Sequence, residues 1–389
     1  QVNNMDYMFY GCSSLTDLEL NHFKTNNLEK MKHMFNGCNK LSNLNLSNFD
    51  TTLVTNMEFL FAGCSSLSFL DISNFNTKSV NNMESMFSGC YKLKNLEISH
   101  FQTDNVINMN SMFKDCSFLT SISISHFNTS KTVNMASLFS GCTLISSLDI
   151  YNFDTSNTEN MDSMFDSCSS LTSLNLTNFQ TSNVLSMKKM FYQCSSLTSL
   201  DINNFDTSKV TNMEYLFAGC TQITSLNLDN FEVNNVINMN SMFKSCFSLT
   251  SINLASFITN KVINTEYMFS KCISLKEINI SNFLMNEIKT TNYMFSGCKS
   301  LISIIFPDLS SSIVTSLSYM FSDCPSLKSL DLSSFDTSQV KNMDYMFSGC
   351  AYLSYLDISN FNTAKVTNMK YMFSECSSLT TLDLNSFNT

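Results

Sequence analysis

The chain has 389 residues, a net charge of −10, and neither arginine nor tryptophan. Hydrophobic residues make up 43% of it, so it can bury a core and is not a disordered tract. The thin negative charge argues against a nucleic-acid-binding protein, which needs clustered Lys and Arg, and the longest apolar run of four residues excludes membrane insertion in this segment.

The cysteines recur every 26 residues from Cys12 to Cys376, so the chain contains fifteen in-phase repeats less one residue. A period of this length predicts a solenoid, not two or three globular domains. Positions within a repeat are numbered here relative to its cysteine. Neither end resembles a capping repeat and no signal peptide is visible. We therefore expect residues 1–389 to be a single array within a longer chain.

The segment that runs up to each cysteine predicts a short helix. Its apolar residues are spaced at i, i+3, i+4 and i+7, as in Met213, Leu216, Phe217 and Cys220. Asn at −8 is a good N-cap, and all eight glycines lie at −1, where a left-handed residue would end the helix. The other seven repeats lack this glycine, so we expect a strained or differently shaped stop there.

The segment after each cysteine predicts a short parallel strand, because Leu or Ile at +6 and +8 alternates with polar residues. Phe at +11, replaced only by Leu309, and Thr at +13 in twelve repeats lead into the next coil. One strand and one helix per coil give an α/β, leucine-rich-repeat-like solenoid of about fifteen coils. Helices are wider than strands, so we expect the strands on a concave side.

The repeat reads Leu-x-x-Leu-x-Leu/Ile-x-x-Phe-x-Thr-x-x-Val-x-Asn-Met-x-x-Met-Phe-x-Gly-Cys. Over the whole chain it resembles the BspA-like leucine-rich repeat surface proteins, for example at residues 205–213. The resemblance implies an extracellular or cell-surface protein used in adhesion or matrix contact. Phe205 stands where that family often has Trp and where ordinary leucine-rich repeats bury an Asn. No Asn ladder is expected there, and Asn at +10, such as Asn48, is a substitute to test.

The cysteine ladder lies on the apolar side of every repeat, without any Cys-x-x-Cys pair, which favours buried free thiols. Disulfides between adjacent coils remain an alternative, and a metal site is the least favoured one. The ladder consists of Cys12, Cys38, Cys64, Cys90, Cys116, Cys142, Cys168, Cys194, Cys220, Cys246, Cys272, Cys298, Cys324, Cys350 and Cys376.

A polar ladder at +7 should project from the concave sheet. Its acidic members include Asp71, Asp149, Asp201, Asp331, Asp357 and Asp383, with Asn in several other repeats. Mixing Asn with Asp relieves the repulsion of stacked carboxylates, which favours a solvated strand face. The alternative is a ligand- or Ca²⁺-binding strip, although the spacing does not match an EF-hand loop.

An aromatic row occupies position −5 in five consecutive repeats, on the helix face expected to point away from the core. It consists of Tyr267, Tyr293, Tyr319, Tyr345 and Tyr371. Tyrosine is common at interfaces, so this row is a candidate surface for lateral packing or partner contact. The competing interpretation is that it merely reflects duplication of neighbouring repeats.

Other chemistry finds little support. Four sequons are possible N-glycosylation sites, at Asn45, Asn128, Asn175 and Asn279, of which Asn128 in the turn is the most accessible. The four histidines, His22, His33, His100 and His126, form no arrangement with a nucleophile and an acid. We therefore expect no enzyme, no cofactor and no metal.

The sequence favours a structural or adhesive repeat protein that contacts proteins or glycans of a surface or matrix. Three alternatives remain. In the first, the chain is a subunit of a self-assembling filament that contacts other copies of itself. In the second, it is a receptor-like module that binds a ligand on the concave sheet. An ice-binding surface formed by Thr at +13 is disfavoured, because one Thr per coil makes no dense array.

Overall fold

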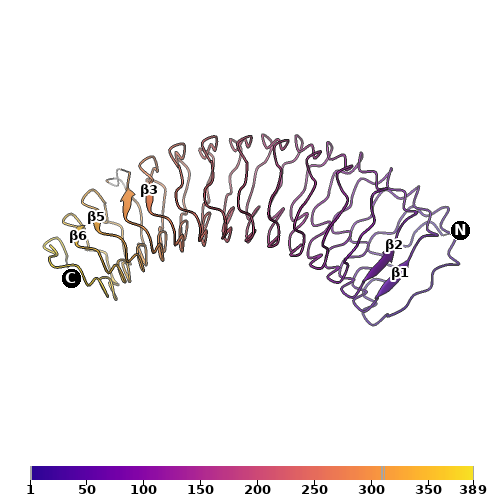
Figure 1. Ribbon diagram of the computed structural model, residues 1–389, viewed down its shortest axis with the longest axis horizontal. Helices are drawn as coiled ribbons and strands as arrows, with labels where there is room; N and C mark the ends of the chain where they lie inside the picture. Colours follow the sequence, from indigo (N-terminus) through magenta and orange to yellow (C-terminus); the bar gives the residue numbers. More distant parts are fainter. Residues whose placement is uncertain (1, 308–309, 311, 389) are drawn as a thin grey trace. The chain divides into compact units, whose positions relative to one another are not determined.

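The computed structural model describes residues 2–307, 310 and 312–388, so Leu309 lies outside the described part. The chain forms two compact units. One consists of residues up to 184 together with 189–197, and the other of residues 185–188 together with those from 198 onward. Within each unit, successive 26-residue coils lie side by side (Figure 1). The predicted solenoid is thus confirmed within each unit.

The strands are short and parallel. β1 (Asn43–Asn45) pairs with β2 (Phe69–Asp71), β3 (Glu277–Asn279) with β4 (Ser303–Ile305), and β5 (Ser329–Asp331) with β6 (Tyr355–Asp357). All of them occupy positions +5 to +7, and within the described residues six coils contain a strand, not every coil as predicted. In β1, β3 and β5 the central residue is buried and both neighbours are exposed, which confirms the half-buried strand in these coils.

The predicted helix is wrong, because the described residues contain no helix at all. The segment before each cysteine is instead a run of overlapping turns. In every coil, positions −5 and −1 both take the left-handed conformation, as Tyr215 (φ 57°) and Gly219 (φ 78°) do. A right-handed helix cannot continue through such residues.

Hydrogen bonds explain why the turns form. Alternate amides bond within the coil, as Leu216 N does to Met213 O at 3.1 Å. The intervening amides donate to the next coil, as Tyr215 N does to Asn240 O at 2.9 Å. Single parallel bridges also join the −8 residues of consecutive coils, such as Asn82 and Asn108. The segment therefore satisfies half of its amides only when a neighbouring coil is present.

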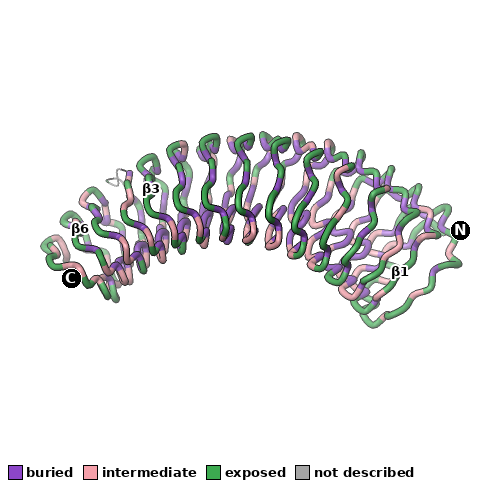
Figure 2. The backbone as a smooth tube through the Cα atoms, viewed as in Figure 1, coloured by how far each residue is buried: buried purple, intermediate pink, exposed green. Residues whose placement is uncertain are grey.

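The inward side of the segment is nevertheless as predicted. Buried positions recur in every coil (Figure 2), and the side chains of Met213, Leu216, Phe217 and Cys220 are completely buried. The Phe residues at −3 stack on those of the next coil with nearly parallel rings, for example Phe87 on Phe113 with centroids 5.8 Å apart. Coil-to-coil stacking of these apolar side chains is the main stabilising contact.

The left-handed stop at −1 has one shape throughout the described coils. The eight glycines have φ between 70° and 79°, as expected. The seven other residues at −1 adopt the same conformation, from Asp323 at 56° to Lys271 at 62°. The expectation of a differently shaped stop is therefore wrong. The alternative, a strained backbone at the seven residues other than glycine, still applies, because a side chain disfavours the left-handed conformation.

Gly141→Ala is expected to destabilise the first unit by about 2 kcal/mol. A Cβ atom at Gly141 would lie 3.1 Å from the Cα atom of Asp115 and even closer to its carboxylate, in a backbone with φ 75°. Urea denaturation measures the loss. Gly63→Ala is the control, because its Cβ meets only ordinary contacts of 3.6 Å or more, and an equal loss in both variants would contradict the steric argument.

The threonines at +13 form a hydrogen-bonded ladder, a role that the sequence did not indicate, in place of an asparagine ladder. In several coils the buried Thr hydroxyl at +13 bonds the backbone of residue +12 in the next coil twice. Thr77 Oγ1 accepts from Gln102 N at 2.7 Å and donates to Gln102 O at 2.9 Å. The suggested Asn at +10 also contributes, because Asn48 Nδ2 donates to Phe23 O at 3.2 Å.

Candidate interaction surfaces

The tyrosine row is a stack. The ring centroids of Tyr267, Tyr293, Tyr319 and Tyr345 follow one another at 4.6, 4.4 and 4.4 Å, with interplanar angles of 10° or less, and Tyr371 continues the row at 4.8 Å. The row does not lie on a helix, and its rings cover one another's faces. Tyr371 is exposed, and the other four tyrosines are half-buried.

Desolvation and the neighbouring hydroxyls raise the pKa of Tyr319 to about 12. The phenol of Tyr319 therefore stays protonated near neutral pH. Each stacked pair of rings stabilises the packing of adjacent coils, whether or not a partner binds. The surface left for a partner consists of ring edges and hydroxyl groups.

A shorter stack at the same repeat position was missed. His33 lies between Tyr7 and Phe59, with ring centroids at 4.6 and 4.7 Å. Burial is the main cause that lowers the pKa of His33, and the nearby carboxylate of Glu58 opposes this effect. The signal was present in the sequence, since position −5 is aromatic or His in the first three repeats.

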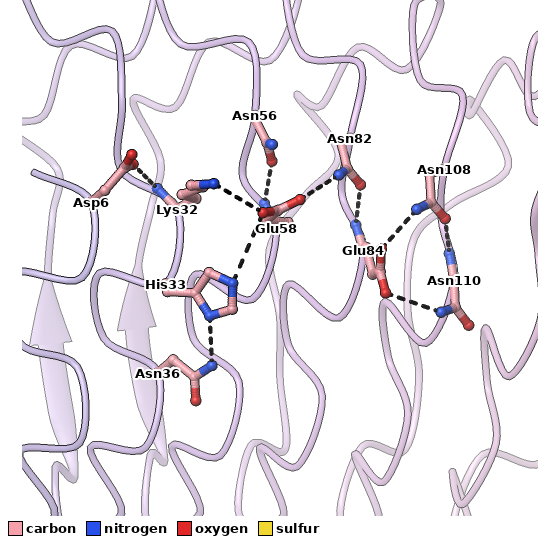
Figure 3. A network of polar contacts seen from close by, with 10 residues as sticks. All are labelled: Asp6, Lys32, His33, Asn36, Asn56, Glu58, Asn82, Glu84, Asn108 and Asn110. Atoms are coloured by element: carbon pink, nitrogen blue, oxygen red, sulfur yellow. Dashed lines mark hydrogen bonds and ion pairs between the residues drawn. The ribbon is translucent and has the colours of Figure 1, made fainter. Parts of the chain in front are cut away.

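A polar network lies beside this stack (Figure 3). The Lys32 ammonium is 3.6 Å from the Glu58 carboxylate, which also accepts from Asn82 Nδ2 at 2.7 Å. The next coil repeats the contact, with Asn108 Nδ2 donating to Glu84 at 2.9 Å. These groups bind one another between coils, so the network serves the stacking of the array.

The acidic residues at +7 lie on the strand face. Asp149, Asp201, Asp331 and Asp383 are exposed, while Asp71 and Asp357 are partly exposed. Most of these carboxylates also hold a turn, which the sequence did not indicate. Oδ1 of Asp71, Asp201, Asp331, Asp357 and Asp383 accepts from the backbone amide two residues later, at 2.9–3.2 Å.

This contact is an Asx turn, which Asn forms as well as Asp does. It accounts for the exchange of the two residues along the ladder. The hydrogen bonds from Ser359 lower the pKa of Asp357. No group of three or more potential metal ligands occurs within the described residues.

Thirteen of the fifteen thiols are buried, while Cys12 is exposed and Cys376 partly so. The thiol of one coil donates to the carbonyl of the −3 Phe in the preceding coil, as Cys142 Sγ does to Phe113 O at 3.1 Å. Burial raises the pKa of Cys38 to about 11 and that of Cys116 to about 12. We propose that the ladder consists of free thiols. Complete alkylation without prior reduction would support this, and labelling of all fifteen only after reduction would overturn it.

The sequons and histidines lie apart from one another. Asn45, Asn175 and Asn279 are exposed on the strand face, and Asn128 is exposed in the turn, where its Nδ2 donates to Asp104 at 2.8 Å. His100 bonds the carbonyl of Ile72 at 3.1 Å. The use of these four Asn residues as glycan sites remains a prediction. The described part of the chain has no helix long and apolar enough to cross a membrane.

Comparisons with known proteins agree with this fold. A family model described as "Mycoplasma protein of unknown function, DUF285" matches residues 3–123, 92–200, 117–225, 194–307 and 306–389. No curated protein matches the sequence. A leucine-rich repeat protein from Bacteroides ovatus has a TM-score of 0.57 and 19% identity, with 92% of this chain and 83% of that chain covered.

Two further structures match less well. A leucine rich cell surface protein from Faecalibacterium prausnitzii has a TM-score of 0.40 and 18% identity, with 90% of this chain and 82% of that one covered. A leucine-rich repeat protein from Eubacterium ventriosum has a TM-score of 0.39 and 14% identity, with 90% of this chain and 80% of that chain covered. The family match and the Bacteroides ovatus structure confirm the resemblance to bacterial leucine-rich repeat proteins, which at this identity concerns the fold.

Proposed function

The chain belongs to the family described as Mycoplasma protein of unknown function, DUF285, and from this premise we propose that it is a non-catalytic binding scaffold at the cell surface. It contacts proteins or glycans of a surface or matrix through side chains repeated on consecutive coils. The observation that carries the proposal is the uniformity of the coils. Hydrogen-bond ladders hold each exposed row at a constant 26-residue register.

Such rows suit multivalent contact, because weak contacts on successive coils add up when they are held at a fixed spacing. Burial of the thiols keeps them away from oxidants in solvent, which suits an extracellular location. The described histidines support the non-catalytic part, since His33 and His100 are engaged in contacts within and between coils.

In-phase deletion tests the scaffold. Removing residues 221–246 or 221–272 takes out one or two whole coils and leaves the stacking pattern intact. Binding of the purified protein to wells coated with basement-membrane extract should fall stepwise with coil number. A 13-residue deletion, 221–233, is the control that breaks the register and should unfold the array locally. Undiminished binding by both in-phase deletions would contradict repeated contact.

The tyrosine row is the surface that we propose for partner contact. Replacing Tyr293, Tyr319 and Tyr345 by Ser removes three consecutive rings and should weaken binding in the same assay about tenfold. The matched variant with Phe at these positions keeps the stack and loses only the hydroxyl groups, which separates contact from stability. Sedimentation of the Ser variant would also reveal any loss of self-association. Binding equal to that of the unmodified protein would exclude this row.

A further inference from the structure

A groove crosses the strand face where β6 lies beside the next coil. It has a volume of about 600 Å³ and is lined by residues 354–359 and 381–385. Tyr355, Asp357 and Ser359 alternate along one coil, and Asp383 and Asn385 along the other. Tyr355 and Asp357 lie two apart in the extended strand β6 and so point to the same side, while Ser359 and Asn385 lie in the turns that follow. The groove therefore gathers one aromatic and several polar side chains on one face.

Tyr355 is unusual at its repeat position. Position +5 is Ser in eight coils, including Ser303 and Ser329 of the two preceding ones. The side chain is 55% exposed, and no other ring among the described residues stacks on it, in contrast to the tyrosine row. A face of its ring is thus available to an apolar ligand surface.

The carboxylates beside Tyr355 are held in place. Asp357 Oδ1 accepts from Ser359 N at 3.0 Å and from its hydroxyl at 2.7 Å, and Asp383 Oδ1 accepts from Asn385 N at 2.9 Å. The second oxygen of Asp357 lies 3.5 Å from the Tyr355 hydroxyl. The charge of Asp357 raises the pKa of Tyr355, so this hydroxyl stays protonated and able to donate.

We propose that this groove binds a neutral sugar residue of a glycan. A sugar ring offers an apolar C–H face, which suits the exposed Tyr355 ring, and hydroxyl donors, which suit the oriented carboxylates of Asp357 and Asp383. The carboxylates, with Asp331 in the preceding coil, repel uronic and sialic acids. This inference deepens the proposed binding role and rests on it for its biological meaning.

Saturation-transfer NMR with the full chain tests the proposal. The probes are β-1,4-linked hexamers of glucose and of N-acetylglucosamine, an α-1,6-linked mannose hexamer, and a galacturonate hexamer as the anionic comparison. At least one neutral hexamer should show transfer and galacturonate none. Failure of all three neutral hexamers, or preferential binding of galacturonate, overturns the proposal.

Variants assign the binding to the groove. Tyr355→Ser, the residue of the preceding coils, should abolish transfer, and Tyr355→Trp should retain it. Asp357→Asn keeps the turn and should weaken binding about tenfold. Phe69→Ser, at the same repeat position in β2, is the control and should change nothing. Binding that survives Tyr355→Ser overturns the site. Because the assay uses free sugars, its failure leaves the coil-deletion test of the scaffold intact.

Discussion

Raising the pH from 8 to 10 is expected to destabilise the array severely. Burial raises the pKa of eleven enclosed thiols above the ordinary value of about 9, to about 11 for Cys38 and to about 12 for Cys116, Cys246 and Cys324. Unfolded thiols ionise near pH 9 while these folded ones stay protonated. Stability is therefore fully present below pH 9 and is lost as the pH rises toward the folded pKa values.

The expected size follows from the linkage. Each enclosed thiol costs about 1.4 kcal/mol of stability at pH 10. Eleven of them reach the order of 15 kcal/mol, which equals or exceeds the whole stability of a typical domain. Urea midpoints followed by circular dichroism between pH 7 and 10.5 measure the effect.

The control separates thiols from tyrosines and lysines, which titrate in the same range. The triple variant with Cys90, Cys116 and Cys142 replaced by Ala loses three ionisable groups and keeps all others. Its stability should fall less steeply with pH. The loss between neutral pH and pH 10 should be about 4 kcal/mol smaller than that of the unmodified protein. Identical pH profiles for both proteins would show that the thiols are not the cause.

Thr77→Val is expected to cost about 3 kcal/mol in the first unit. The hydroxyl of Thr77 is buried and bonds both the amide and the carbonyl of Gln102. Valine has the same shape and leaves two backbone groups without a partner, each at a cost of roughly 1–3 kcal/mol. Urea denaturation at neutral pH gives the difference in stability.

Two variants act as controls for the threonine ladder. Thr77→Ser keeps the hydroxyl and should lose less than half as much. Val233 occupies the same repeat position in the second unit, and the amide of Ile258 in the next coil bonds Ser256 O instead. Val233→Thr should therefore stabilise the second unit by about 1 kcal/mol. Equal losses for Thr77→Val and Thr77→Ser would refute the role of the hydroxyl.

The candidate surfaces were only partly visible in the sequence. The period placed the five tyrosines in one row, and their spacing by whole coils made contact between them predictable in principle. Their mutual stacking reduces the free surface, and this depends on rotamers that a pattern of residues does not specify. The groove at Tyr355 was not foreseen, because a single Tyr among serines has no meaning until Asp357, Asp383 and the groove around them lie beside it.

The sequence by itself determined the solenoid, the inward-facing residues and the position of the short parallel strands that six of the described coils form, because burial depends on spacing along the chain. Met213, Leu216, Phe217 and Cys220 are buried as their spacing requires. Only the tertiary structure decided that this segment is a series of turns. A helix and a series of stacked turns bury the same side chains. They differ in which carbonyl groups accept hydrogen bonds from the backbone amides. Tyr215 N bonds Asn240 O of the next coil, an acceptor that exists only once the coils are stacked.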